Sequence, residues 1–398
     1  MTVRGAFAPF ANGRFSLYFT GQVLSNTGTW FQNLALSLVV LEATGSARAL
    51  SGVTVAQFLP LLLLSVPAGR VADRVRPRTI LLATSLLSAA IVACLAAVTL
   101  VPDVPVAAFY GLVAALGTVH TFDRIAAQAI IFEIVGHGEL GRAVSLSTIA
   151  LASARSIGPS LAGIAFQGFG ATVCMLVNAG SFLLVFVSIV LIRPAALHPR
   201  QTRERSAGPG RRRPRPDPSL VTLLIVNAVV ALLALNLMLV LTSTVTLTFR
   251  GDAAAVGLAH TLNAVGAIIG GILAASRATV GVRSLIGACA GLGIALLANA
   301  AAPELGILLL LGPLLGLGVG YYQGVLNAAA QVGVPPQHIG RTMSLVTLGN
   351  YGMVPFGALL MGWVIDAHGG RIALAIGGCA ALACAVFVVL RQGIRPPT

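Results

Sequence analysis

The stretch GRVADRVRPR, from Gly69 to Arg78, gathers one acid and four arginines between two long apolar segments. The rest of the chain differs sharply, because 57% of its residues are hydrophobic, 9% are charged, and its mean hydropathy is +0.93. Such a composition leaves too little polar surface to cover a soluble globule. We therefore expect a lipid bilayer to cover the protein and the charged stretch to be a turn at the cytoplasmic surface.

Apolar stretches of membrane-spanning length fill the chain. A helix needs about 20 mostly apolar residues to cross a bilayer. Twelve such stretches can be read, at residues 15–41, 49–69, 79–101, 106–127, 143–167, 171–192, 220–248, 256–275, 284–302, 305–331, 343–365 and 372–390. The sequence predicts an all-α membrane protein with twelve transmembrane helices.

The basic residues indicate the orientation. All 25 are arginine, and if the odd-numbered spans run outward, only Arg48, Arg250 and Arg371 lie on the outer side. Arg124 and Arg155 fall in spans or at their edges, and the remaining arginines lie on the inner side. The positive-inside rule then predicts that both termini are cytoplasmic. The net charge of +14 reflects this topology, so we expect no nucleic-acid partner.

The longest hydrophilic interval is rich in Pro and Arg and covers residues 193–219. It predicts a mostly unstructured cytoplasmic linker between two six-helix bundles, at residues 1–192 and 220–398. Contact with anionic lipid headgroups is an alternative role for its arginines. The first apolar run is long and lacks a cleavage site, so we expect it to remain as the first span rather than act as a signal peptide.

No enzymatic or metal-binding motif is present. The chain has no lysine for a phosphate-binding loop, no HExxH and no GxSxG. The five cysteines all fall inside predicted spans, where they predict neither a disulfide framework nor a metal site. We therefore expect no enzyme activity, no cofactor and no metal.

The two sets of six spans, the basic central loop and the charged turn together resemble the major facilitator superfamily, whose pattern at this turn is GxLaDRxGRK. Four positions match, and three depart from the pattern. The matches are Gly69, Asp73, Arg74 and Arg78, and the departures are Val71, Arg76 and Pro77. Four further segments resemble the exporter subgroup that includes bacterial siderophore and macrolide efflux proteins: LEATGSARAL (41–50), TFDRIAAQAI (121–130), ELGRAV (139–144) and ARSIGPSLAG (154–163).

The resemblance implies a cytoplasmic gate. In the family, the acid matching Asp73 caps the start of span eleven and joins a relay with basic residues of the turn and an acid of span four. A carboxylate is favoured near a helix N-terminus, so we expect Asp73 to close the two halves near residues 342–344. Asp123 lies about 25 Å along span four, and Arg76 or Arg78 would bridge to it. The predicted gate is Gly69, Asp73, Arg74, Arg76, Arg78 and Asp123; the alternative is a set of ordinary solvated charges.

Polar residues inside the spans are candidates for a central cavity. Arg155 lies about 18 Å along span five, near mid-bilayer, where a charge costs about 2.5 to 3.5 kcal/mol. Arg155 either binds an anionic group of the substrate or is a structural residue bonded to backbone carbonyls and to Asn33. Polar stripes in spans one and ten favour a cavity, although interhelical hydrogen bonds would also explain them. The candidates are Gln22, Asn26, Trp30, Asn33, Arg155, Asn227, Asn236, His260, Asn263, Tyr322, Gln323, Asn327, Asn350 and Tyr351.

We expect a bacterial cytoplasmic-membrane exporter that moves a small amphipathic molecule by alternating access. The segment with Gly158, Pro159 and Gly163 resembles the antiporter motif of span five, which implies proton antiport. No acid lies at mid-membrane, so the candidates for proton coupling are Asp123, His120 and His260; either histidine could equally be a neutral hydrogen-bonding group. The expected partners are substrate, protons and membrane lipid, with the protein as a monomer. The alternatives are an uptake carrier or facilitator on the same fold, and a transporter-like scaffold or sensor.

Overall fold

A computed structural model describes residues 8–102, 104–194, 198, 218–277, 281–332 and 336–393. Every regular element within these ranges is helical. The first half (residues 8–194) contains η1 (Ala8–Ala11), α2 (Gly13–Thr44), α3 (Ala47–Arg74), α4 (Pro77–Val98) and α5 (Val106–Leu191). The second half (residues 218–393) contains α6 (Pro218–Leu233), α7 (Leu237–Ser243), η3 (Thr244–Thr248), α8 (Ala253–Ala275), α9 (Val282–Ala300), α10 (Leu305–Ala329), α11 (Pro336–His368) and α12 (Gly370–Gly393). Most of the predicted linker lies outside the described residues.

The long helix α5 is interrupted twice by glycine. Gly136 has φ 70° and Gly170 has φ 78°, a left-handed region that side chains with a Cβ rarely adopt. These two breaks divide α5 into three segments, at residues 106–135, 137–169 and 171–191. The sequence predicted three spans over the same part of the chain.

A further interruption lies between α6 and α7, within one predicted span. The side chain of Asn236 donates hydrogen bonds to the carbonyls of Ala231 and Leu232, at 3.2 and 3.1 Å. Carbonyls at a helix end lack intrahelical donors. Asn236 therefore stabilises the end of α6 inside an apolar segment.

Nine helices of the described chain are long and apolar enough to cross a membrane, judged by length and composition. They include segments 106–136 and 157–191 of α5 and the combined segment 220–248. Helix α9 is apolar but shorter, at residues 284–300. The result agrees with the expectation of a multi-spanning helical protein.

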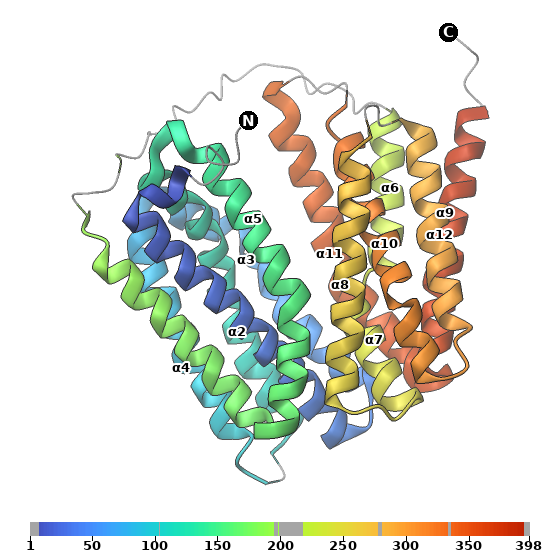
Figure 1. Cartoon of the computed structure of the whole chain (residues 1–398), viewed down its shortest axis with the longest axis horizontal. Coiled ribbons are helices and arrows are strands. Elements are labelled where there is room, and N and C mark those ends of the chain that lie inside the picture. Colours follow the sequence, from blue (N-terminus) through green and yellow to red (C-terminus); the bar gives the residue numbers. More distant parts are fainter. Residues whose placement is uncertain are drawn as a thin grey trace.

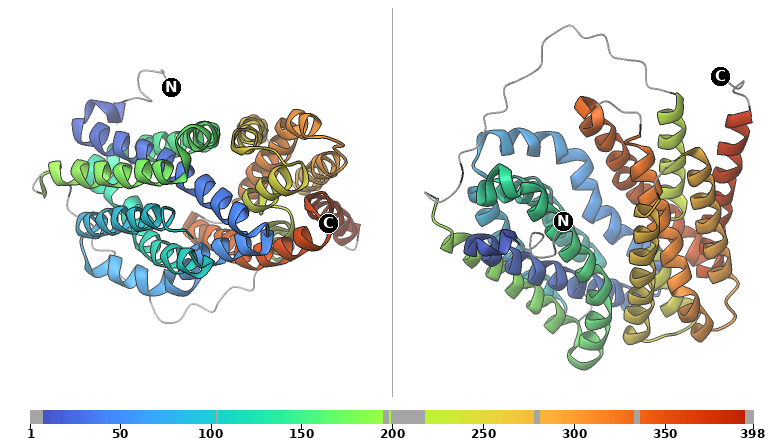
Figure 2. Two further views of the ribbon diagram at one scale, coloured as in Figure 1. Left: turned by 90° about the horizontal axis from the view of Figure 1, so that it is seen from below. Right: turned by 45° about the horizontal axis from the view of Figure 1, so that its top comes forward.

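The two halves lie side by side, and their helices approach each other most closely at one end (Figures 1 and 2). In Figure 1 this is the lower end, whereas α2 begins and α12 ends at the upper end, where the halves diverge. Contacts between the halves run mainly through two helix pairs, α5 with α8 and α3 with α11. We call the two ends of the molecule the joined end and the divergent end.

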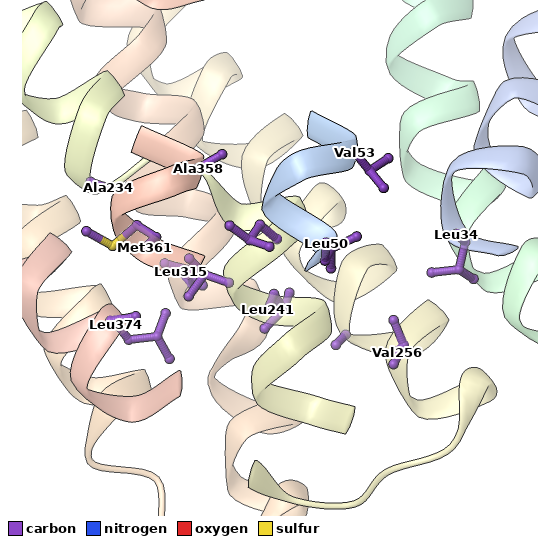
Figure 3. Close-up of a cluster of buried hydrophobic side chains, with 14 of the residues drawn as sticks. Leu34, Leu50, Val53, Ala234, Leu241, Val256, Leu315, Ala358, Met361 and Leu374 are labelled. Atoms are coloured by element: carbon purple, nitrogen blue, oxygen red, sulfur yellow. The ribbon is translucent and has the colours of Figure 1, made fainter. Parts of the chain in front are cut away.

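Hydrophobic packing follows the same division. One buried cluster is shared by both halves and includes Leu34, Leu50 and Val53 of the first half with Leu241 and Val256 of the second (Figure 3). A second cluster, with Phe15, Tyr18, Leu81, Ile130 and Ile189, is formed by the first half alone. Burial of apolar surface is the main favourable term in packing. The shared core therefore holds the halves together at the joined end.

Candidate functional site

The charged turn connects α3 to α4. Asp73, Arg74 and Arg76 are exposed, and Gly69 is half-buried with open space where a Cβ would stand. Pro77 occupies the first turn of α4, where its missing N–H costs nothing. Helix α11 begins at Pro336, about two turns before the predicted start. The helix N-terminus that Asp73 is expected to meet therefore lies among residues 333–341, whose side chains are outside the described set.

The structure does not place Arg78 against Asp123. The Arg78 guanidinium donates to the carbonyls of Ile192 and Val190, at 3.2 and 3.3 Å. The last carbonyls of a helix lack intrahelical donors and attract cations. Arg78 therefore anchors the end of α5, and the bridge expected from it to Asp123 is absent. Arg76, the other candidate for that bridge, is exposed.

Asp123 instead belongs to a polar cluster inside the first half. Its Oδ1 accepts a hydrogen bond from the Thr84 hydroxyl at 2.8 Å. One turn further along α5, the Ala127 carbonyl accepts from the Tyr18 hydroxyl at 3.5 Å, and this hydroxyl accepts from Gln22 Nε2 at 3.0 Å. His120 lies one turn before Arg124 and packs beside the Phe182 ring, 5.7 Å between centroids. Sequence reasoning missed Thr84 and Tyr18, although Tyr18 lies four residues before Gln22 and so continues the polar stripe of span one.

Four predicted cavity residues are buried within the second half. Tyr322 and Asn227 are 0% exposed, Asn236 is 6% and His260 is 8%. Asn227 donates to the carbonyl of Val346 at 2.9 Å, and His260 shares a hydrogen bond with Thr242 at 2.8 Å. These residues therefore pack between helices of one half and line no open space in this structure. Hydrogen bonding between helices, the alternative interpretation of the polar spans, accounts for Asn227 and His260.

The other cavity candidates remain partly accessible. Tyr351 is 40% exposed, and Trp30 packs against Gly158. The backbone of Arg155 lies within α5, but its side chain is outside the described set, as is its expected contact with Asn33. The half-buried candidates are Gln22, Asn26, Trp30, Asn33, Asn263, Gln323, Asn327 and Asn350.

A carboxylate joins the two halves at the joined end, and the sequence did not single it out. Asp366, near the end of α11, accepts hydrogen bonds from the backbone N–H groups of Ala47 and Arg48, at 2.6 and 3.1 Å, and from the Ser46 hydroxyl at 2.6 Å. Arg48 Nε lies 3.8 Å from the same carboxylate. The first N–H groups of a helix have no intrahelical acceptor and favour an anion. Asp366 therefore caps α3 from the opposite half.

The second contact at the joined end pairs α5 with α8. Gln167 donates to Asp252, whose other oxygen accepts from the N–H of Ala255 at 2.8 Å and caps α8. A Cβ at Gly163 would collide with the carbonyl of Ala253, and one at Gly257 with the carbonyl of Pro159. Both glycines are therefore needed for the two backbones to approach. Gly158, Pro159 and Gly163 thus lie on a helix face that contacts a neighbour directly.

One further contact between the halves lies away from both ends. The Tyr351 ring of α11 stacks on the Phe58 ring of α3, with centroids 6.3 Å apart and planes at 21°. The guanidinium of Arg124, on α5, lies 5.1 Å from the centre of the Tyr351 ring. Of these three residues, sequence reasoning named only Tyr351 as a site candidate.

Comparison with known proteins places this geometry in a family. The model of the transmembrane secretion effector family matches residues 4–397. The chain is 22% identical over 396 residues to macrolide efflux protein A of Streptococcus pyogenes, covering 95% of this chain and 97% of that one. It is 27% identical over 373 residues to the multidrug efflux pump Tap of Mycolicibacterium fortuitum, covering 90% of each.

The fold is also that of solved transporters. A bacterial homologue of the iron transporter ferroportin, solved in an inward-facing state, superposes with a TM-score of 0.72 at 15% identity, covering 96% of this chain and 99% of that one. The predicted resemblance to the major facilitator superfamily is confirmed, as is the expectation of a transporter rather than an enzyme. The chain belongs to the transmembrane secretion effector family of the major facilitator superfamily, and is a multi-pass membrane transporter of small molecules.

Proposed function

We propose that this protein exports a small amphipathic molecule across the bacterial cytoplasmic membrane, by proton antiport and alternating access. It would act as a monomer with twelve spans in two six-helix bundles, residues 1–192 and 220–398, connected by the linker 193–219, with both termini cytoplasmic. The arginine distribution supports this orientation. The names of the two efflux relatives support export.

The observation that carries the proposal is the one-sided junction between the halves. Asp366 caps α3, and Gln167 bonds to Asp252, both at the joined end. The beginning of α2 and the end of α12 lie at the divergent end (Figure 1). With cytoplasmic termini, the joined end faces outward and the divergent end faces the cytoplasm. This is the inward-facing arrangement expected of an exporter that is ready to load substrate.

Transport would then proceed by rocking of the two halves about a site between them. Substrate enters from the divergent end. Closure brings Asp73 to the start of α11, while the Asp366 contact breaks and the joined end opens outward. Proton uptake and release fall to the Asp123 cluster with His120, or to His260.

The proton gradient can supply the driving force. One proton moving across ~100 mV provides ~2.3 kcal/mol, and one pH unit adds ~1.4 kcal/mol. Together, ~3.7 kcal/mol sustains a substrate gradient of roughly 500-fold. This is sufficient for useful export of a toxic or secreted compound.

The test is efflux from a pump-deficient bacterial host across a panel of antibiotics, dyes and siderophores, with and without protonophore. We expect protonophore-sensitive export that is lost in Asp73→Asn and retained in Glu304→Gln. Glu304 is an exposed carboxylate at the start of α10 that makes no capping hydrogen bond. Accumulation inside the cell would favour an uptake carrier. No movement of any compound, despite correct insertion, would favour a scaffold or sensor and refute the proposal.

A further inference from the structure

Arg124 is a charged residue near the inner end of the predicted membrane span 106–127. It lies 18 residues after the start of α5 at Val106, or about 27 Å along a helix that rises 1.5 Å per residue. A charge within the hydrocarbon core faces the protein interior or a water-filled space, because facing lipid is costly. Arg124 is nevertheless exposed. Its contact with Tyr351 places it on the face of α5 turned toward the second half, so its exposure is to the space between the halves.

Among the described residues, the guanidinium of Arg124 has no hydrogen-bond acceptor and no ion-pair partner. Within the described residues, ion pairs are formed by Arg48 with Asp366 and by Arg142 with Glu139, and none by Arg124. The adjacent Asp123 carboxylate accepts from Thr84 instead.

Three other arginines, Arg277, Arg371 and Arg391, lie over aromatic rings, and two of them also donate to an oxygen. Arg371 also donates to the carbonyl of Pro303, at 2.6 Å, and Arg391 to the hydroxyl of Thr222, at 2.7 Å. For Arg124 the described structure provides the ring but no oxygen acceptor. An arginine carries five N–H donors and no acceptor, so the groups that Arg124 can bind are oxygen acceptors.

Two aromatic rings stand beside these donors. Tyr351 is 40% exposed and stacks on Phe58, so the pair offers an apolar surface next to a single positive charge. A guanidinium binds a carboxylate through two parallel hydrogen bonds, and aromatic rings pack against flat apolar groups. Arg124 contributes one positive charge and its chain neighbour Asp123 a carboxylate, so the site carries at most one net positive charge, which favours a singly charged carboxylate over a doubly charged phosphate.

We propose that Arg124, with Tyr351 and Phe58, binds the transported molecule, and that this molecule is an amphipathic anion with a carboxylate attached to an aromatic or flat apolar body. The inference rests on the proposed function and deepens it by naming a substrate class. Tyr351 belongs to α11 and the other two residues to the first half. A bound substrate would therefore contact both halves, so its binding would be coupled to their rocking motion.

The test is isothermal titration calorimetry on the purified full chain in detergent, with 2-naphthoate and the neutral 2-naphthamide as probes. The two probes share one ring system and differ in charge. We expect the wild-type protein to bind 2-naphthoate at least about tenfold more tightly, equivalent to about 1.4 kcal/mol. Arg124→Gln should remove this preference while leaving 2-naphthamide affinity unchanged, and Arg124→Lys should keep part of it. Tyr351→Leu should weaken both probes.

The matched control is Arg277→Gln. Arg277 also lies over a tyrosine ring, 5.3 Å from the centre of Tyr321, but both residues belong to the second half. This variant should keep the full preference for 2-naphthoate. Equal affinities of the wild type for the two probes, no saturable binding of 2-naphthoate, or equal loss in both arginine variants would overturn the proposal. Unchanged melting temperature and elution volume show that each variant is folded.

The two proposals fail in different experiments. Charge-selective binding that depends on Arg124, without export of any compound, would refute the exporter and support the anion site. Protonophore-sensitive export together with equal affinity for the two naphthyl probes would refute the anion site and support the exporter.

Discussion

Under the proposed mechanism, removing the Asp366 carboxylate should shift the protein from the inward-facing toward the outward-facing arrangement. The carboxylate accepts two backbone N–H groups of α3 and the Ser46 hydroxyl, and its side chain is 18% exposed. A cap of this kind contributes about 0.5 to 2 kcal/mol, and an acid at a helix N-terminus about 0.3 to 1 kcal/mol. The ion pair with Arg48 adds little, because Arg48 is 56% exposed.

We therefore expect Asp366→Ala to weaken the junction by about 2 kcal/mol, which changes the ratio of the two arrangements about 30-fold. Asp366→Asn should have a smaller effect, since its amide oxygen still accepts while its charge is lost. The measurement is the distance between nitroxide labels at Leu100→Cys and Ala301→Cys, on exposed positions of the two halves, in a cysteine-free background. A longer distance component should appear in Asp366→Ala.

The control for this experiment is Glu304→Gln, which removes a carboxylate of the second half that caps nothing through its side chain. Its distance distribution should match that of the wild type. If Asp366→Ala also matches the wild type, the carboxylate does not hold the halves together, and the interpretation of the joined end as a gate is wrong.

Three further substitutions test other parts of the structure. Gly257→Ala should push α8 away from α5 and lower export several-fold, because the added methyl group meets a backbone carbonyl. Its control is Gly168→Ala, whose added methyl group meets open space, so this variant should retain wild-type export in the same assay. Thr84→Val should lower stability by about 1 to 3 kcal/mol by removing the donor to Asp123, measured as a drop in melting temperature. Tyr322→Phe should keep export and leave the melting temperature equal or higher, because the buried hydroxyl lacks a partner in the described structure. Loss of export would instead indicate that the Tyr322 hydroxyl contacts the substrate in a cavity.

The sequence predicted where the helical segments lie better than it predicted which of their side chains face a cavity. Apolar runs separated by charged or glycine-containing turns mark the spans, because a bilayer requires a minimum apolar length. The aromatic candidate Tyr322 in α10 is buried inside the second half, because the sequence does not distinguish a side chain packed between helices of one bundle from one that faces a cavity. Spacing also could not show that Arg78 prefers the carbonyls at the end of α5, because those carbonyls lie more than one hundred residues further along the chain.

The joined end could not have been predicted from local patterns for the same reason. Ser46 reads as the N-cap of α3, and it also accepts from the N–H of Ala49 at 3.3 Å. Nothing in that segment indicates that Asp366, 320 residues away, also accepts a hydrogen bond from Ser46. Likewise, Gly163 and Gly257 are ordinary in isolation, and only the crossing of α5 with α8 shows why neither position accommodates a side chain.

Under the proposed mechanism, α3 and α11 form a reciprocal pair. The two helices run in opposite directions across the membrane, and each carries an acid in its last turn, Asp73 and Asp366. A carboxylate at a helix C-terminus is disfavoured by its own helix dipole and favoured at the N-terminus of the partner. Asp366 occupies that position on α3 in the inward-facing arrangement, and Asp73 would occupy the equivalent position on α11 in the outward-facing one.

Rigid halves cannot close at both ends at once. Each acid therefore stabilises the arrangement in which it makes its contact, and that contact is broken in the other arrangement. Asp73→Asn and Asp366→Asn should consequently shift the label distance in opposite directions, and their double variant should return close to the wild-type distribution, because sites at opposite membrane surfaces contribute additively. Shifts in the same direction would show that the two acids do not oppose each other.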